Sequence, residues 1–145
     1  MWSINEGICL LFLIIIAVRD IQTREISVVA LVLGLFFSVG YHIVTRRMDV
    51  WSIFGGIFVG CIFMILSKVT KEGMGYGDSF VILILGIYLG FFDLLLVLSM
   101  TFFLLLCVSI PTLYIRKMSR TYTLPFLPFL AGGYICFWLM GGVNS

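Results

Sequence analysis

The stretch VWSIFGGIFVGCIFMIL, residues 50–66, runs for 17 residues without a charged side chain. A run of about 17–25 apolar residues is long enough to cross the hydrocarbon core of a bilayer as an α-helix. A helix satisfies its backbone hydrogen bonds internally, which lipid requires because it offers no partners of its own. The stretch therefore predicts a transmembrane helix.

Five further apolar runs, separated by short polar clusters, predict the same structure; they are residues 8–18, 27–44, 79–92, 93–115 and 125–143. The first, which can extend back to Ser3, and the run 79–92 are short for a span, so they would thin the bilayer locally or continue into loops. Ser27 is a suitable N-cap for its run.

Composition agrees with a lipid environment. The chain is 62% hydrophobic and 11% charged, with a mean hydropathy of +1.21, whereas a soluble domain has about 25% charged residues. We therefore expect an all-α polytopic membrane protein with about six transmembrane helices, forming a single domain over residues 1–145. The formal net charge of +2 is too small to indicate a nucleic-acid partner.

Lysine and arginine are distributed unequally between alternate loops, and the richer side of a membrane protein is cytoplasmic. Only Arg46 and Arg47 lie in one set of loops, whereas the other set holds the remaining basic residues, namely Arg19, Arg24, Lys68, Lys71, Arg116, Lys117 and Arg120. We therefore expect the first, third and fifth loops in the cytoplasm and both termini outside.

Small residues suggest how the helices pack. Gly56 with Gly60, and Gly86 with Gly90, form G-x-x-x-G patterns, which let helix backbones approach closely in lipid. Four cysteines form no C-x-x-C pair and lie in apolar runs, so we interpret them as small hydrophobic residues; they are Cys9, Cys61, Cys107 and Cys136.

Ionisable side chains at membrane depth cost roughly 2.5–3.5 kcal/mol on insertion scales and usually mark function. Among the acids expected on the cytoplasmic side, Asp20 and Asp78 lie closest to the apolar runs. Each also has a purely structural explanation. Asp20 could be a solvated loop acid paired weakly with Arg19 or Arg24, and Asp78 or Ser79 could cap the fourth helix.

The two acids together suggest a reaction. Carboxyls that meet at one membrane face cannot both ionise easily, so they share one proton. The ionised acid could take a proton from a water that attacks a peptide carbonyl, while the protonated acid polarises that carbonyl. No metal or cofactor is required. The sequence does not show that Asp20 and Asp78 meet, and the only histidine, His42, lies near the predicted outer face, which disfavours a histidine-based triad.

Three segments in this order resemble the prepilin peptidase family, the type IV leader peptidases. GYGD, residues 75–78, reads as the G-x-G-D motif of membrane aspartic proteases. DIQTREI, residues 20–26, is similar to the family's D-x-x-x-R-x-I-P stretch. LPFLPFLA, residues 124–131, resembles the proline- and phenylalanine-rich segment before the family's last helix, and its physical interpretation is a turn that starts a helix.

The resemblance implies an aspartic endopeptidase of the bacterial plasma membrane. It would remove the short basic leader of pilin-like precursors at the cytoplasmic face, usually after a glycine that precedes an apolar helix. The catalytic pair would be Asp20 and Asp78. Gly75 and Gly77 would let the substrate lie close to the backbone, because glycine has no side chain to obstruct it.

The sequence also departs from the family's pattern. Many relatives carry a lysine in G-D-x-K, where this chain has Ser79 and Phe80, and Ser27 replaces a proline. The cytoplasmic domain with C-x-x-C pairs of larger, bifunctional relatives is absent, so we expect cleavage without methylation. Presenilin-like enzymes share G-x-G-D, but they carry the first aspartate within a helix and have a P-A-L element that this chain lacks.

Two other functions stay open at this point. A non-catalytic scaffold with the same fold could hold pilin-like proteins in the bilayer through glycine-rich helix faces. A proton-coupled transporter could use the acids as a relay, although the sequence has no internal repeat and no acid near the middle of a predicted span.

Overall fold

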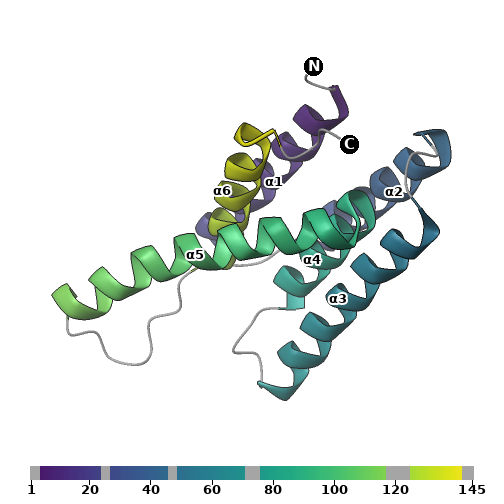
Figure 1. Ribbon diagram of the computed structural model, residues 1–145. Helices are drawn as coiled ribbons and strands as arrows, with labels where there is room; N and C mark the ends of the chain where they lie inside the picture. The colour runs from purple at the N-terminus through teal and green to yellow at the C-terminus, as the bar shows by residue number, and fades with distance from the viewer. Residues whose placement is uncertain (1–3, 24–26, 46–48, 71–75, 117–124, 142–145) are drawn as a thin grey trace. The chain divides into compact units, whose positions relative to one another are not determined.

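The computed structural model describes residues 4–23, 27–45, 49–70, 76–116 and 125–141, and in these ranges it is all-helical. The helices follow each other along the chain as Figure 1 labels them. Their bounds are α1 Ile4–Thr23, α2 Val28–Thr45, α3 Val50–Val69, α4 Tyr76–Leu89, α5 Phe91–Arg116 and α6 Phe126–Leu139. The all-α prediction is therefore confirmed for the described residues.

Three of the described helices are long and apolar enough to cross a membrane, namely α2, α3 and α5. Helices α4 and α6 are apolar but only 14 residues long. Helix α1 has 20 residues, but it carries Glu6 near its start and Arg19 and Asp20 near its end. The chain is thus a membrane protein, whereas six crossings and the outside position of both termini stay predictions.

Helix boundaries agree with the sequence in some places and differ in others. Ser27 occupies the N-cap position of α2, where its carbonyl oxygen accepts a hydrogen bond from the Leu31 N–H at 3.2 Å. Pro125 directly precedes α6 with φ −66°, as a turn that starts a helix requires. Helix α1 begins at Ile4, within the expected extension back to Ser3, but it ends at Thr23 rather than at Val18.

Gly90 was expected to pack helices together, and that prediction is wrong. Its φ is 83°, a left-handed conformation that glycine adopts without the steric cost of a Cβ. It therefore ends α4 and begins α5, and the boundary between these helices lies at Gly90 rather than after Phe92.

The chain divides into two compact units, one of Met1–Arg24 with Leu96–Ser145 and the other of Glu25–Leu95. In the second unit, α4 packs against α3 and α2. Ser79 near the start of α4 contacts Phe63 near the end of α3, so these helices are antiparallel. Ser38 and His42 of α2 meet successive turns of α4, so α2 and α4 are parallel.

In the first unit, α1 packs antiparallel to α6. The Trp138 indole Nε1–H near the end of α6 donates to Glu6 Oε2 near the start of α1 at 3.0 Å. The buried thiol of Cys9 lies against the Tyr134 side chain one turn further along. Helix α5 crosses α6 at Gly133, where a Cβ would lie 2.9 Å from the backbone nitrogen of Thr101.

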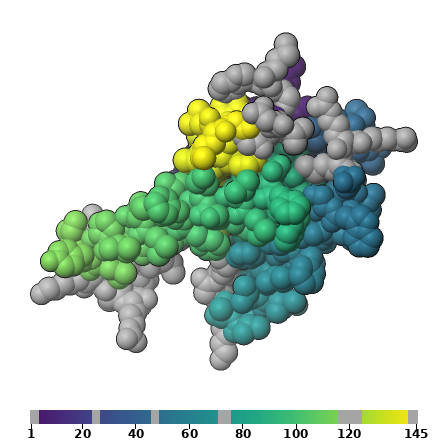
Figure 2. Space-filling view, viewed as in Figure 1, coloured from purple at the N-terminus to yellow at the C-terminus, as the bar shows by residue number. Residues whose placement is uncertain are grey.

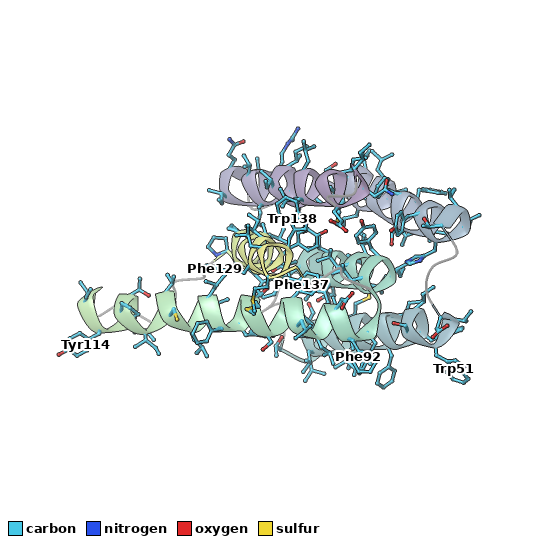
Figure 3. The ribbon with its side chains drawn as sticks, turned by 45° about the horizontal axis from the view of Figure 1, so that its top comes forward. Trp51, Phe92, Tyr114, Phe129, Phe137 and Trp138 are labelled. Atoms are coloured by element: carbon cyan, nitrogen blue, oxygen red, sulfur yellow. The ribbon has the colours of Figure 1, made fainter. Side chains whose placement is uncertain are left out.

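The outer surfaces of the helices are apolar. In Figure 2 the side chains of the C-terminal part of α5, in light green, lie at the surface, and they include Leu106, Ile110 and Leu113. Trp51 at the start of α3 and Tyr114 near the end of α5 are 87% and 88% exposed and are labelled in Figure 3. Such aromatic side chains at helix ends are typical of membrane–water interfaces.

Candidate active site

Asp78 is the third residue of α4, in the first turn, and it is half-buried. The sequence placed it just before this helix, and the structure places it just inside. The first turn of a helix favours a carboxylate, because unpaired N–H groups give that end a partial positive charge. The position of Asp78 therefore agrees with the structural explanation, in which its carboxylate interacts favourably with the start of the helix. This position is also compatible with a catalytic role.

The structural alternative in which Ser79 caps α4 does not hold. The side chain is fully buried, and its hydroxyl donates to the backbone carbonyl oxygen of Phe63 in α3 at 3.2 Å. An interhelical hydrogen bond of this kind is a common way for serine to join helices in lipid. It attaches α4 to α3 one residue after Asp78.

Further along α4 from Ser79, glycines bring this helix into close contact with α3. A Cβ at Gly86 would lie 2.5 Å from the carbonyl oxygen of Gly56, and a Cβ at Gly60 would lie 2.7 Å from the Cα of Leu83. Both distances are far below an ordinary carbon contact, so the two helix backbones touch. The packing role predicted for Gly56, Gly60 and Gly86 is confirmed.

Helix α2 holds α4 from another side. The Ser38 hydroxyl, fully buried, donates to the carbonyl oxygen of Ile84 at 3.2 Å, and the His42 ring nitrogen Nε2 contacts the carbonyl oxygen of Ile87. Tyr41 of α2 packs on Tyr88 with ring centroids 5.0 Å apart. His42 lies near the end of α4 opposite to Asp78, which agrees with its predicted distance from that acid.

Asp20 lies in the last turns of α1 and is also half-buried. The sequence placed it just after a span, and the structure places it inside the helix. A first aspartate inside a helix therefore does not distinguish this chain from presenilin-like enzymes, and the missing P-A-L element is the difference that stands. Asp20 lies towards the end of α1 at which the antiparallel α6 begins.

The structure thus brings Asp78 and Gly77 together in one turn of α4. Gly75 lies outside the described residues. Asp20 belongs to the first unit and Asp78 to the second, so their pairing stays a prediction. Within the described residues no three His, Cys, Asp or Glu side chains gather as a metal site.

The sequence suggested Ser79 as a cap and as part of the departure from G-D-x-K, but neither its bond to α3 nor the role of Ser38 was predicted. A signal was present, however. Along α3 the small residues Ser52, Gly56 and Gly60 recur every four positions, which marks one face of a helix. That stripe receives α4, and its first member accepts a hydrogen bond from the Phe91 N–H at 3.2 Å.

Comparison with known proteins gives one match. A family model described as the type IV leader peptidase family matches residues 7–110, which include Asp20, Asp78 and the glycines of the G-x-G-D motif. No curated protein and no solved structure matches the chain.

Proposed function

Because the chain belongs to the type IV leader peptidase family, we propose that it is a membrane aspartic endopeptidase that removes the basic leader of prepilin-like precursors. The cut is made at the cytoplasmic face of a bacterial plasma membrane. The observation that carries the proposal is the family match, since it spans both acids and the G-x-G-D motif. The apolar helices and the half-buried positions of Asp20 and Asp78 support it.

The two acids divide the chemistry between them. One carboxylate takes a proton from a water molecule as that water attacks the scissile carbonyl carbon, and the other acid, protonated, donates a hydrogen bond to the carbonyl oxygen. A proton then reaches the leaving amine, and the peptide bond breaks. Asp20 and Asp78 perform these steps as a coupled pair that shares one proton.

Helix directions support a common face for both acids. With six crossings, odd-numbered helices run towards the cytoplasm and even-numbered helices away from it. Within the second unit α2 and α4 are parallel and α3 is antiparallel to them, and within the first unit α1 is antiparallel to α6. These directions agree with that order, in which the end of α1 and the start of α4 are cytoplasmic.

The substrate approaches along the start of α4. Gly77 and Gly75 have no side chain to obstruct a substrate, so we expect the extended segment around the scissile bond to lie beside them, while the apolar helix of the precursor stays in lipid. Phe80, which stands where many relatives have lysine, is 37% exposed. It offers an apolar contact at this position and no positive charge, and the choice among precursors is expected to differ accordingly.

Cleavage by the purified protein in detergent tests the proposal. The probe is a synthetic precursor whose short basic leader ends in glycine ahead of an apolar helix. Asp20→Asn and Asp78→Asn are each expected to lower the rate at least about 100-fold, because a missing acid–base group costs about 10²–10⁴.

Asp93→Asn is the matched control. Asp93 is the third residue of α5 and half-buried, as Asp78 is in α4, so both changes remove the same helix-end charge. Asp93→Asn is expected to keep the parent rate. Cleavage at the parent rate by either candidate variant refutes the assigned roles. Precursor binding without product, in parent and variants alike, supports the scaffold function instead.

A further inference from the structure

The first turn of α4 is intrinsically weak. It contains Tyr76, Gly77 and Asp78, and glycine is a poor helix former because its backbone loses the most freedom on ordering. A candidate catalytic acid therefore lies on a turn whose own residues hold it poorly. Its position depends on what attaches the turn to neighbouring helices.

Ser79 makes that attachment. Its side chain is fully buried, and its hydroxyl donates to the Phe63 carbonyl oxygen at 3.2 Å. Because the side chain is fully buried, no water can replace the carbonyl, and losing the bond leaves a polar group unsatisfied. The hydrogen bond therefore fixes both the height of the first turn along α3 and its rotation.

Rotation matters because neighbouring residues point in different directions. Successive residues of an α-helix are turned by about 100°. With Ser79 held against α3, the direction of the half-buried Asp78 side chain differs from that of Ser79 by this angle. A change in the Ser79 contact therefore turns or lifts the Asp78 carboxyl before it changes the rest of α4, which Gly60 and Gly56 hold further along.

We propose that Ser79 is a positioning residue of the peptidase, which holds the Asp78 carboxyl in register with the attacking water through its hydrogen bond to Phe63. This inference rests on the proposed function. A catalytic group must be held within about 0.5 Å of its working position, and a misplacement of about 1 Å can cost about 100-fold in rate. Ser79 touches no reacting atom, so its effect passes through Asp78.

The competing explanation is that Ser79 only stabilises the helix pair. Ser38 provides a matched control for this possibility. It is also fully buried, and its hydroxyl donates to a backbone carbonyl of a neighbouring helix, Ile84 O, at the same 3.2 Å. This bond reaches α4 six residues after Asp78, so it stabilises the same helix without holding its first turn.

The experiment measures kcat and KM of the full chain in detergent with the synthetic precursor, together with the midpoint of thermal unfolding. Ser79→Ala and Ser38→Ala are expected to lower the midpoint similarly, since each removes one equivalent bond. Ser79→Ala is expected to lower kcat about tenfold with KM within about twofold, whereas Ser38→Ala keeps kcat within about twofold. Ser79→Cys, which keeps a weak donor, is expected to have an intermediate kcat.

Equal kcat for Ser79→Ala and Ser38→Ala overturns the inference, as does a change in KM alone. If Ser79→Ala does not fold, Ser79→Cys decides the question, and a kcat equal to that of the parent overturns the inference. Failure of the proposed function has a different signature, which is cleavage by Asp20→Asn or Asp78→Asn at the parent rate.

Discussion

Gly86→Ala tests how closely the position of the candidate acid depends on the contact between α3 and α4. The added Cβ would lie 2.5 Å from the Gly56 carbonyl oxygen and 2.8 Å from its carbon, where ordinary contacts begin at 3.4 Å. The neighbouring atoms are backbone and cannot rotate away, so the helices must separate by about 0.9 Å at this point. Overpacking of this kind costs about 1–3 kcal/mol.

Two effects follow from this separation. Alanine gains up to about 1 kcal/mol over glycine in a helix interior, so the net loss in the free energy of unfolding is expected to be about 0–2 kcal/mol. The catalytic effect is larger, because a shift of nearly 1 Å that reaches Asp78 can cost up to about 100-fold in rate. Gly86→Ala is therefore expected to lose activity out of proportion to its loss of stability.

Gly40→Ala is the control for this experiment. Gly40 lies inside α2, and a Cβ there would meet nothing within 4 Å. The change is expected to leave cleavage unaltered and to keep or raise stability. Unfolding is followed by circular dichroism during titration with a denaturing detergent, and cleavage is measured with the synthetic precursor. If Gly86→Ala cleaves and unfolds as Gly40→Ala does, the backbone contact does not position the acid.

Two further predictions concern the first unit and the bilayer. Trp138→Phe removes the indole donor to Glu6 and is expected to lower the free energy of unfolding by about 1 kcal/mol. The control Trp51→Phe, at an 87% exposed position, is expected to change the free energy of unfolding little. Equal free energies of unfolding for the two variants contradict the α1–α6 bond. In vesicles, cleavage is expected to be faster in short-chain than in long-chain phosphatidylcholine, because two 14-residue helices are shorter than a standard bilayer core. A rate that rises with chain length contradicts this prediction.

The helices could be predicted from the sequence because each apolar run is bounded by polar residues, as residues 50–66 are. The packing role of Gly56 and Gly60 followed from their spacing. Gly90 has the same spacing from Gly86, yet it ends a helix with φ 83°. Sequence alone does not distinguish these uses, since glycine serves both close packing and left-handed turns.

The contact of Ser79 with α3 was not predicted for a different reason: the spacing of Ser52, Gly56 and Gly60 marks the face of α3 that receives α4, but not the register between the two helices. Soluble helices show which face is buried by alternating apolar and polar residues. In lipid, both the packed face and the lipid-facing side are apolar, so the register between α3 and α4 is set by side-chain fit alone. Asp20 and Asp78 were identified as candidate catalytic residues because acids are rare in such apolar runs. Because they lie far apart along the chain, the sequence does not show whether they meet.

The lengths of the helices give a physical reason for the location of the two acids. Helix α3 continues from Phe63 to Val69, which is a rise of about 9 Å. Ser79 is bonded to Phe63, and Asp78 comes one residue before Ser79 in an antiparallel helix. Asp78 therefore lies roughly 7 Å before the end of α3. The pairing of Glu6 with Trp138 sets Phe126, the first residue of α6, level with about Val18, and α1 continues to Thr23.

In each unit, therefore, an acid lies near the level at which a 14-residue helix starts. The neighbouring 20-residue helix continues beyond that level. A helix of 14 residues is about 21 Å long, whereas the hydrocarbon core is about 30 Å thick. The start of a short helix lets water and headgroups reach deeper than they do along its longer neighbour. For the proposed peptidase, access of water from this end lowers the cost of an ionised carboxyl. The proposed cleavage consumes water, so we expect the start of each short helix to be where water reaches the acid of its own unit.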